Sequence, residues 1–319
     1  MNLFGTEIDG PMAVIRAIHF AATAVTAGAL IFRELVAEPS LHSASASIRA
    51  GAEGQIRMVV WIGLATAVVT GLIWLLLQTV SMSGQALGEA ISSGAFLDVV
   101  NETGFGFVTE VRLLLAVALA ICLAFDGIFL LRWLAFAAAI CLVAAIAWTG
   151  HAASTPYALG YLHLASDALH LTAAAAWLGG LICVALLLGF TRGDLTLASQ
   201  QFDAVRRFSA LGIASVAALI VSGIINTWIL VGSIRALVAT DYGRLLMLKL
   251  AAFVVMMAFA VVNRVWLTPQ LAASVKAGAR RCADRALTRN TLFEIVLGFS
   301  IFCMVAVLGT LHPAIHLAK

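Results

Sequence analysis

The sequence predicts an all-α polytopic membrane protein with about eight transmembrane helices. Hydrophobic residues make up 62% of the 319-residue chain, charged residues only 11%, and the mean hydropathy is +1.04. Because a soluble domain carries about 25% charged residues, this chain has too little polar surface to cover a water-soluble globule. The composition excludes a cytosolic enzyme. The net charge of +3, without a basic patch interleaved with aromatics, gives no support to nucleic-acid binding.

The predicted spans are apolar runs of roughly the 20 residues that a helix needs to cross the hydrocarbon core of a bilayer. The residues before the first run lack the positive region of a signal peptide, so we expect the first span to be retained. The eight runs are Met12–Phe32, Met58–Leu77, Glu110–Phe125, Trp133–Trp148, Leu162–Phe190, Phe208–Val231, Leu245–Val265 and Leu292–Leu311.

The distribution of Lys and Arg predicts the orientation of these spans. Of the 19 basic residues, 13 fall in loops that follow odd-numbered spans. Positively charged loops face the cytoplasm, so both termini are expected on the other side of the membrane. These 13 residues are Arg33, Arg49, Arg57, Arg132, Arg192, Arg206, Arg207, Arg264, Lys276, Arg280, Arg281, Arg285 and Arg289.

The second half of the chain repeats motifs of the first half in the same order. This pattern predicts two tandem four-helix repeats, residues 1–150 and 151–319, which together form one integral membrane domain. An even number of spans gives both repeats the same orientation, related by a pseudo-twofold axis along the membrane normal. The matched pairs are His19 and His170, Gly28 and Gly179, Gly71 and Gly223, Arg112 and Lys249, and His151 and His312.

Two helical stripes carry the candidate metal ligands. In span five His163, Asp167 and His170 are spaced i, i+4, i+7, which places them on one helical face. In span one Met12 and His19 lie on a comparable stripe. Histidine binds copper, zinc, iron and haem iron, and ionisable groups within a span are functional candidates. We expect the two stripes to form facing walls of one outward-opening polar site.

Two further histidines, His151 and His312, lie where spans four and eight end, and we expect them to be entry ligands. An alternative for any single histidine is a hydrogen bond between helices, and Asp167 has the alternative role of a helix cap. Arg112 and Lys249 lie just inside the outer ends of their spans. They either snorkel toward lipid headgroups or bind an anion, such as a haem propionate or a carboxylate on a partner.

Several motifs resemble the CopD copper-resistance family. The likeness extends from about Arg16 to His312, and its motifs are denser in the second half. The motifs are His170-Leu171, Trp177–Leu181, Arg207–Ser209, Ser222-Gly223, Tyr242–Leu246, Lys249-Leu250, Asn263-Arg264, Thr103–Gly106 with Arg112, and Gly150–Ala153.

The resemblance implies a bacterial inner-membrane protein of copper handling. In such a membrane, the orientation predicted from the Lys and Arg residues places both termini in the periplasm. The resemblance also implies movement of copper from periplasm to cytoplasm alongside a separate periplasmic CopC-type copper-binding protein. No nucleotide-binding loop, zincin motif or Ser/His/Asp arrangement is found, so we expect a transporter rather than an enzyme.

Two alternatives stay open. The first is a haem-binding electron-transfer protein, in which histidine pairs hold haem and Arg112 or Lys249 binds its propionates. The second is a structural or assembly subunit without a metal of its own.

Overall fold

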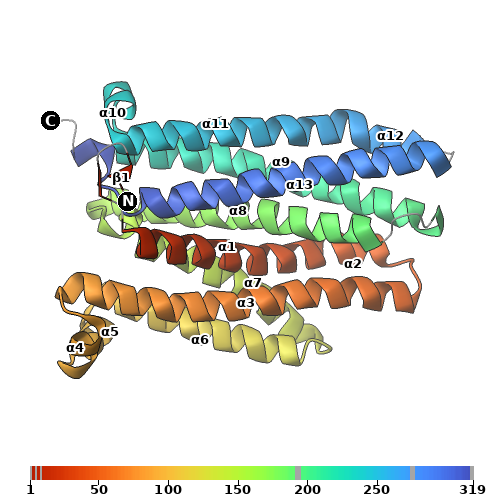
Figure 1. Cartoon of the computed structure of the whole chain (residues 1–319). Helices are drawn as coiled ribbons and strands as arrows, with labels where there is room; N and C mark the ends of the chain where they lie inside the picture. The colour runs from red at the N-terminus through yellow and green to blue at the C-terminus, as the bar shows by residue number, and fades with distance from the viewer. Residues whose placement is uncertain (1, 4–5, 8, 191–194, 274–276, 317–319) are drawn as a thin grey trace.

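The computed structural model describes residues 2–3, 6–7, 9–190, 195–273 and 277–316. Within this described part, eight helices are long and apolar enough to cross a membrane, which confirms the predicted all-α polytopic fold (Figure 1). They run side by side as α1 (Gly10–Phe32), α3 (Ala46–Ser83), α6 (Gly104–Ala124), α7 (Phe129–Ala144), α8 (Tyr157–Phe190), α9 (Ala198–Val231), α11 (Asp241–Val262) and α13 (Ala277–Leu308).

Several spans are longer than their apolar runs predict. Helix α3 begins at Ala46, well before the predicted Met58, because polar turns at its start continue the helix beyond the hydrophobic segment. Other spans continue through a short π-helical or 3-10 segment, which in two cases is followed by a short α-helix. These are η1 (Arg33–Ala37) and α2 (Glu38–Leu41) after α1, η2 (Ala145–Thr149) after α7, and η5 (Asn263–Leu267) and α12 (Thr268–Ala273) after α11.

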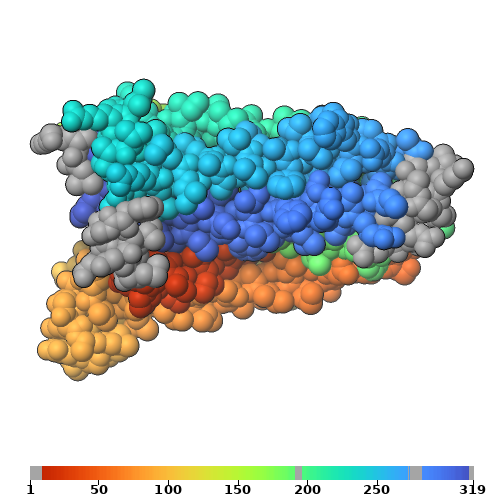
Figure 2. Space-filling view, turned by 45° about the horizontal axis from the view of Figure 1, so that its top comes forward, coloured from red at the N-terminus to blue at the C-terminus, as the bar shows by residue number. Residues whose placement is uncertain are grey.

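The short elements separate into two ends of the bundle. We call the end that carries the first described residues the terminal end. There α4 and α5 form a lobe that projects from the bundle (Figure 2). The other end, with α2 and α12, is called the distal end. Terminal-end elements are β1 (Asn2–Leu3), β2 (Thr6–Glu7), α4 (Leu87–Ser92), α5 (Ala95–Glu102), η3 (His151–Ser154), α10 (Ile234–Ala239) and η6 (Ala314–His316), and η4 (Leu195–Leu197) precedes α9 at the distal end.

The first helices of the two predicted repeats form the centre of the bundle. About seven-tenths of the apolar window of α1 and two-thirds of that of α8 are buried, whereas no more than about two-fifths of the window is buried in any other span. The two helices pack against each other at their matched glycines, Gly28 and Gly179. A Cβ atom added to Gly179 would stand 2.7 Å from the Cα atom of Gly28. Small residues allow such close helix contact within membranes.

Other contacts recur in both halves. Thr103 Oγ1 accepts a hydrogen bond from Gly106 N at 2.9 Å at the start of α6, and Thr240 Oγ1 accepts one from Gly243 N at 3.0 Å at the start of α11. A short helix precedes each of these caps, α5 in the first half and α10 in the second. These matched caps are what the predicted duplication requires. The pseudo-twofold axis and the boundary at residue 150 stay predictions.

The distal end contains a buried network of charges. Glu34 is bound by Arg33 at 2.8 Å and by Arg132 of α7 at 2.7 Å, and Arg132 also reaches Glu38 at 2.7 Å. Arg33 in turn binds Asp126 at 2.6 Å. The network joins α1 and its continuation to α7. Three residues of the charge-distribution argument, Arg192, Lys276 and Lys319, lie outside the described residues, as do the side chains of Arg280 and Arg281.

Candidate metal-binding cavity

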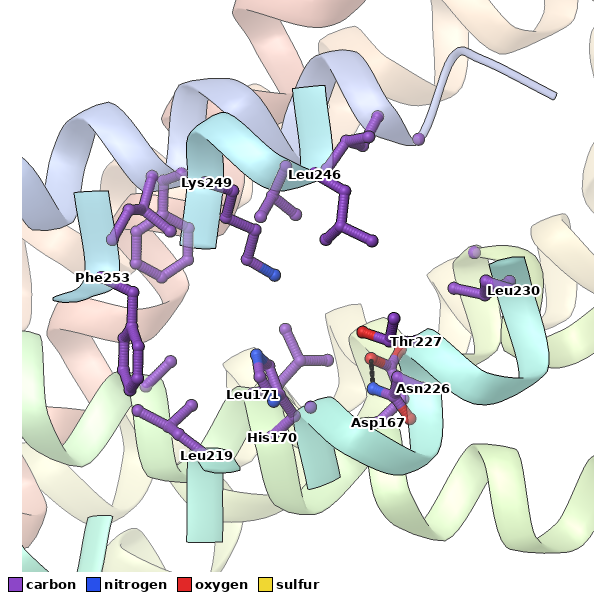
Figure 3. A pocket seen from close by; sticks show the side chains of 18 of the residues that line it. Asp167, His170, Leu171, Leu219, Asn226, Thr227, Leu230, Leu246, Lys249 and Phe253 are labelled. Atoms are coloured by element: carbon purple, nitrogen blue, oxygen red, sulfur yellow. Dashed lines mark hydrogen bonds between the residues drawn. The ribbon is translucent and has the colours of Figure 1, made fainter. Parts of the chain in front are cut away.

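A cavity of about 620 Å³ lies in the second half of the bundle, between α8, α9, α11 and α13. Its walls are largely apolar and include Trp177 and Phe253. Polar side chains enter it from α8 and α11 (Figure 3). Five residues predicted as metal or cofactor ligands line it: His151, His163, Asp167, His170 and Lys249.

His170 presents one ring nitrogen to this cavity. Its Nδ1 lies 2.9 Å from Ser222 Oγ, and Ser222 Oγ donates its own hydrogen to Ala218 O at 2.5 Å. Since the hydroxyl hydrogen is already used, Ser222 accepts from the Nδ1–H of His170. The neutral ring therefore carries its lone pair on Nε2, which has no hydrogen-bond partner among the described residues. A metal-ligating histidine has this arrangement, with its other nitrogen held by a neighbouring group.

His163 repeats this arrangement two turns earlier on α8. Its Nδ1 lies 2.7 Å from Thr155 Oγ1, and that hydroxyl donates to His151 O at 3.3 Å. Nε2 of His163 is thereby left as the acceptor nitrogen. His151 lies close enough to His163 for the charges of the two rings to interact. Because seven residues of helix span about 10.5 Å, His163 and His170 do not share one ion.

An acid and a base lie on opposite sides of the cavity. Asp167 Oδ1 accepts a hydrogen bond from Asn226 Nδ2 at 3.2 Å, and the carboxylate interacts electrostatically with Lys249 of α11. The two charges form no ion pair within the described part of the chain. Lys249 points from α11 into the cavity, toward the side that carries His170 (Figure 3). Asp167 is a cavity residue rather than the predicted alternative of a helix cap.

His19 lies in a different, almost filled cavity of about 30 Å³. Its Nδ1 bonds to Thr70 Oγ1 at 3.1 Å, and its Nε2 contacts Arg112 Nη2. The indole of Trp74 packs edge-on at 5.5 Å between ring centroids. The prediction that His19 and His170 lie on facing walls of one polar site is therefore wrong. The face of α1 that lines the large cavity carries Arg16 and Phe20, and the His19 face points toward α3 and α6.

Met12 and His312 are outside both cavities. Met12 packs in the apolar core with 5% exposure, and His312 is exposed beyond the end of α13. In the described ranges, no three His, Cys, Asp or Glu side chains lie close enough to hold one metal ion. The haem alternative requires a histidine pair in each half. The 30 Å³ beside His19 leaves no room for a haem, and His312 is not beside His170.

Two residues of the cavity have roles that sequence reasoning missed. Ser222 holds the ring of His170 through Nδ1. The sequence contains a signal for this role, because Ser222 and Thr70 precede the matched glycines Gly223 and Gly71. Thr70 holds His19 in the same way. Arg16 lines the cavity wall and donates from Nη1 to Gly309 O at 2.9 Å. The signal in the sequence was the position of this arginine inside the first apolar run, since ionisable residues within a span are candidates for functional sites.

Comparison with known proteins supports the resemblance seen in the motifs. Residues 202–308 match the family model described as copper resistance protein D, and residues 7–161 match the model described as copper resistance protein D-like, N-terminal domain. No solved structure matches the chain significantly.

Three curated proteins are similar over large parts of the chain. Copper resistance protein D of Pseudomonas syringae pv. tomato is 31% identical over 261 residues, which cover 76% of this chain and 82% of that protein. Inner membrane protein YebZ of Escherichia coli (strain K12) is 30% identical over 171 residues, 53% of this chain and 55% of YebZ. Copper transport protein CutJ of Bacillus subtilis (strain 168) is 31% identical over 202 residues, 60% of this chain and 36% of CutJ. The chain therefore belongs to the copper resistance protein D family.

Proposed function

We propose that this protein binds copper through histidines of the large cavity and moves it across the bacterial inner membrane into the cytoplasm. The observation that carries the proposal is the imidazole of His170, held at Nδ1 by Ser222 with Nε2 open to the cavity. The printed names of two relatives, a copper resistance protein and a copper transport protein, support copper as the cargo.

The histidines of the cavity suit stepwise transfer better than storage. His151 and His163 lie near the terminal end, and His170 follows two turns deeper on α8. His163 and His170 each offer one nitrogen, and a copper ion held by few ligands dissociates more readily than one in a closed site. We infer that copper enters at His151 and His163 and passes to His170. His19 joins this route only if Arg112 leaves its ring.

Charge in the cavity sets a condition on the cargo. A copper cation beside His170 is repelled by the ammonium of Lys249 and attracted by the carboxylate of Asp167, both of which line the cavity. The interior screens charges less than water does. Asp167 therefore keeps the site accessible to a cation; its amide replacement should weaken copper binding, whereas the loss of Lys249 should strengthen it.

We further propose that the terminal end faces the periplasm. The excess of Lys and Arg in loops at the distal end supports this orientation. A periplasmic CopC-type copper-binding protein is the proposed donor. The lobe of α4 and α5 lies at the same end and exposes Glu89, Asp98 and Glu102. A donor with a basic face would complement these carboxylates.

Copper uptake into proteoliposomes tests the proposal. The wild-type protein should deliver external copper to a fluorescent copper chelator inside the vesicles, and His170→Ala should reduce the initial rate at least tenfold. His42→Ala is the matched control, because His42 is exposed at the distal end and should leave the rate unchanged. Equal rates in the wild type and His170→Ala would reject His170 as a ligand. No uptake by any of the three would reject transport.

A further inference from the structure

The large cavity exceeds what a copper ion requires. One water in the liquid takes about 30 Å³, and pockets of about 300–1,000 Å³ accept small organic molecules. The 620 Å³ beside His170 falls within that range. Apolar and aromatic side chains dominate its walls, including Trp177 and Phe253, whose rings pack edge-on at 5.8 Å. Such walls match an apolar molecule and contribute nothing to metal ligation.

Comparison of the two halves identifies one small side chain that helps to keep this cavity open. Trp74 follows Gly71 by three residues, and Asn226 follows the matched Gly223 by three. Trp74 is 2% exposed and fills the space beside His19, where only about 30 Å³ remains. Asn226 is much smaller than Trp74 and leaves the corresponding space empty. The small side chain of Asn226 therefore contributes to the larger size of the second cavity.

The cavity opens sideways between α9 and α11. Helix α9 packs along α8, and α11 packs along α13, but α9 and α11 make few contacts with each other. Ile224 and Trp228 of α9 line the cavity and are still 65% and 64% exposed on the outer surface of the bundle. Leu250 of α11 lines it from the other side and is 43% exposed. Since these helices face lipid, the opening leads into the bilayer.

Two of the polar groups inside the cavity, Asp167 and Lys249, together fit a hydroxyl head group. Asp167 and Lys249 carry opposite charges that face each other across the cavity without forming an ion pair in the described structure. Arg16 is already bonded to Gly309 O. Because that acceptor is a neutral carbonyl, Arg16 keeps its positive charge, whereas the charges of Asp167 and Lys249 balance each other. A hydroxyl satisfies both residues, because it donates to a carboxylate and accepts from an ammonium.

We propose that this cavity binds a hydroquinone with an apolar tail. The hydroxyl lies between Asp167 and Lys249, the ring packs beside Phe253, and the tail leaves between α9 and α11 into the bilayer. Nε2 of His170 is not used by this ligand. The proposal goes beyond copper transport and stands without it, because binding of the hydroquinone requires no metal.

Calorimetric titration of a decyl-substituted hydroquinone tests this site in nanodisc-embedded protein under metal-free, anaerobic conditions. The wild type should bind one molecule. Asn226→Trp, which copies the closed half, should weaken binding at least tenfold. Val221→Trp is the matched control, since it adds the same side chain to α9 at an outward position, 56% exposed and outside the cavity. Its affinity should equal that of the wild type. Lys249→Met should also weaken binding, because the hydroxyl loses its donor.

A second filling variant guards against misfolding of Asn226→Trp. Ala174→Leu narrows the same cavity from α8 and should weaken binding as well. The comparison uses the filling variant that keeps the wild-type melting temperature. If this variant binds the hydroquinone as tightly as the wild type does, the proposal is overturned. Decanoate that binds as tightly as the hydroquinone would also overturn it and assign the cavity to acyl chains. Because no copper is present, failure here leaves the copper proposal unaffected.

Discussion

Replacement of Gly28 by alanine should destabilise the bundle at its centre. A Cβ atom at Gly28 would stand 2.8 Å from Gly179 Cα and closer still to Ala175 O, whereas ordinary contact begins at 3.4 Å. Helices α1 and α8 must then separate by at least 0.6 Å at this point. Both partners are backbone atoms, which cannot move aside as a flexible side chain does. Overpacking of this kind costs about 1–3 kcal/mol, more than the roughly 0.5–1 kcal/mol gained when alanine replaces glycine in a helix.

The melting temperature of the purified protein in one detergent measures this effect. Gly54→Ala is the matched control, because Gly54 lies in α3 with nothing within 4 Å of an added Cβ. Gly28→Ala should melt below the wild type, and Gly54→Ala should melt at the same temperature or above it. If Gly28→Ala is as stable as the wild type, α1 and α8 do not meet as closely as described and the central contact is refuted.

Two further substitutions test the buried polar contacts of the first half. Glu34→Gln should lower the free energy of unfolding by about 1.5–3 kcal/mol, because Arg33 and Arg132 lose their shared carboxylate but keep their bonds to Asp126 and Glu38. Chemical denaturation measures this loss. His19→Ala should lower the melting temperature more than His170→Ala does, because it leaves the buried Arg112 without its histidine partner, whereas His170 borders an open cavity.

Controls for these two substitutions come from the same chain. Asp203→Asn removes ion pairs to Arg206 and Arg207 that are partly exposed on α9, so its cost should be below about 1 kcal/mol. A cost equal to that of Glu34→Gln would contradict the buried network. Equal melting temperatures of the two histidine variants would contradict a structural role for His19.

Hydropathy was sufficient to predict the fold class. A segment that crosses lipid must form all its backbone hydrogen bonds within itself, as a helix does. Its side chains face hydrocarbon, so a long apolar run marks it in the sequence. The ends of the helices were less predictable. Helix α3 continues to Ala46 through polar residues that the apolar run does not include. Arg33 and Glu34 are compatible with a buried helical segment because Asp126 and Arg132 bind them. Such pairing between residues distant in sequence leaves no local signal.

The candidate site was predictable in part. The i, i+4, i+7 spacing correctly placed His163, Asp167 and His170 along one cavity, because all three lie on one rigid helix. The position of His19 relative to this cavity depends on the rotation of α1 against α8. Periodicity defines the faces of a helix but not which neighbour each face meets. For the same reason, neither the closure of the first half by Trp74 nor the binding of Arg112 to His19 could be predicted.

X-ray absorption spectroscopy of copper bound to the purified protein tests the central claim most directly. Copper added to the wild type should bind and give the multiple-scattering pattern of imidazole ligands, and His170→Ala should lose bound copper or part of that pattern. His42→Ala should match the wild type, since this histidine lies in an exposed turn at the distal end. A wild-type protein that binds no copper, or a His170→Ala spectrum identical to that of the wild type, would contradict the account.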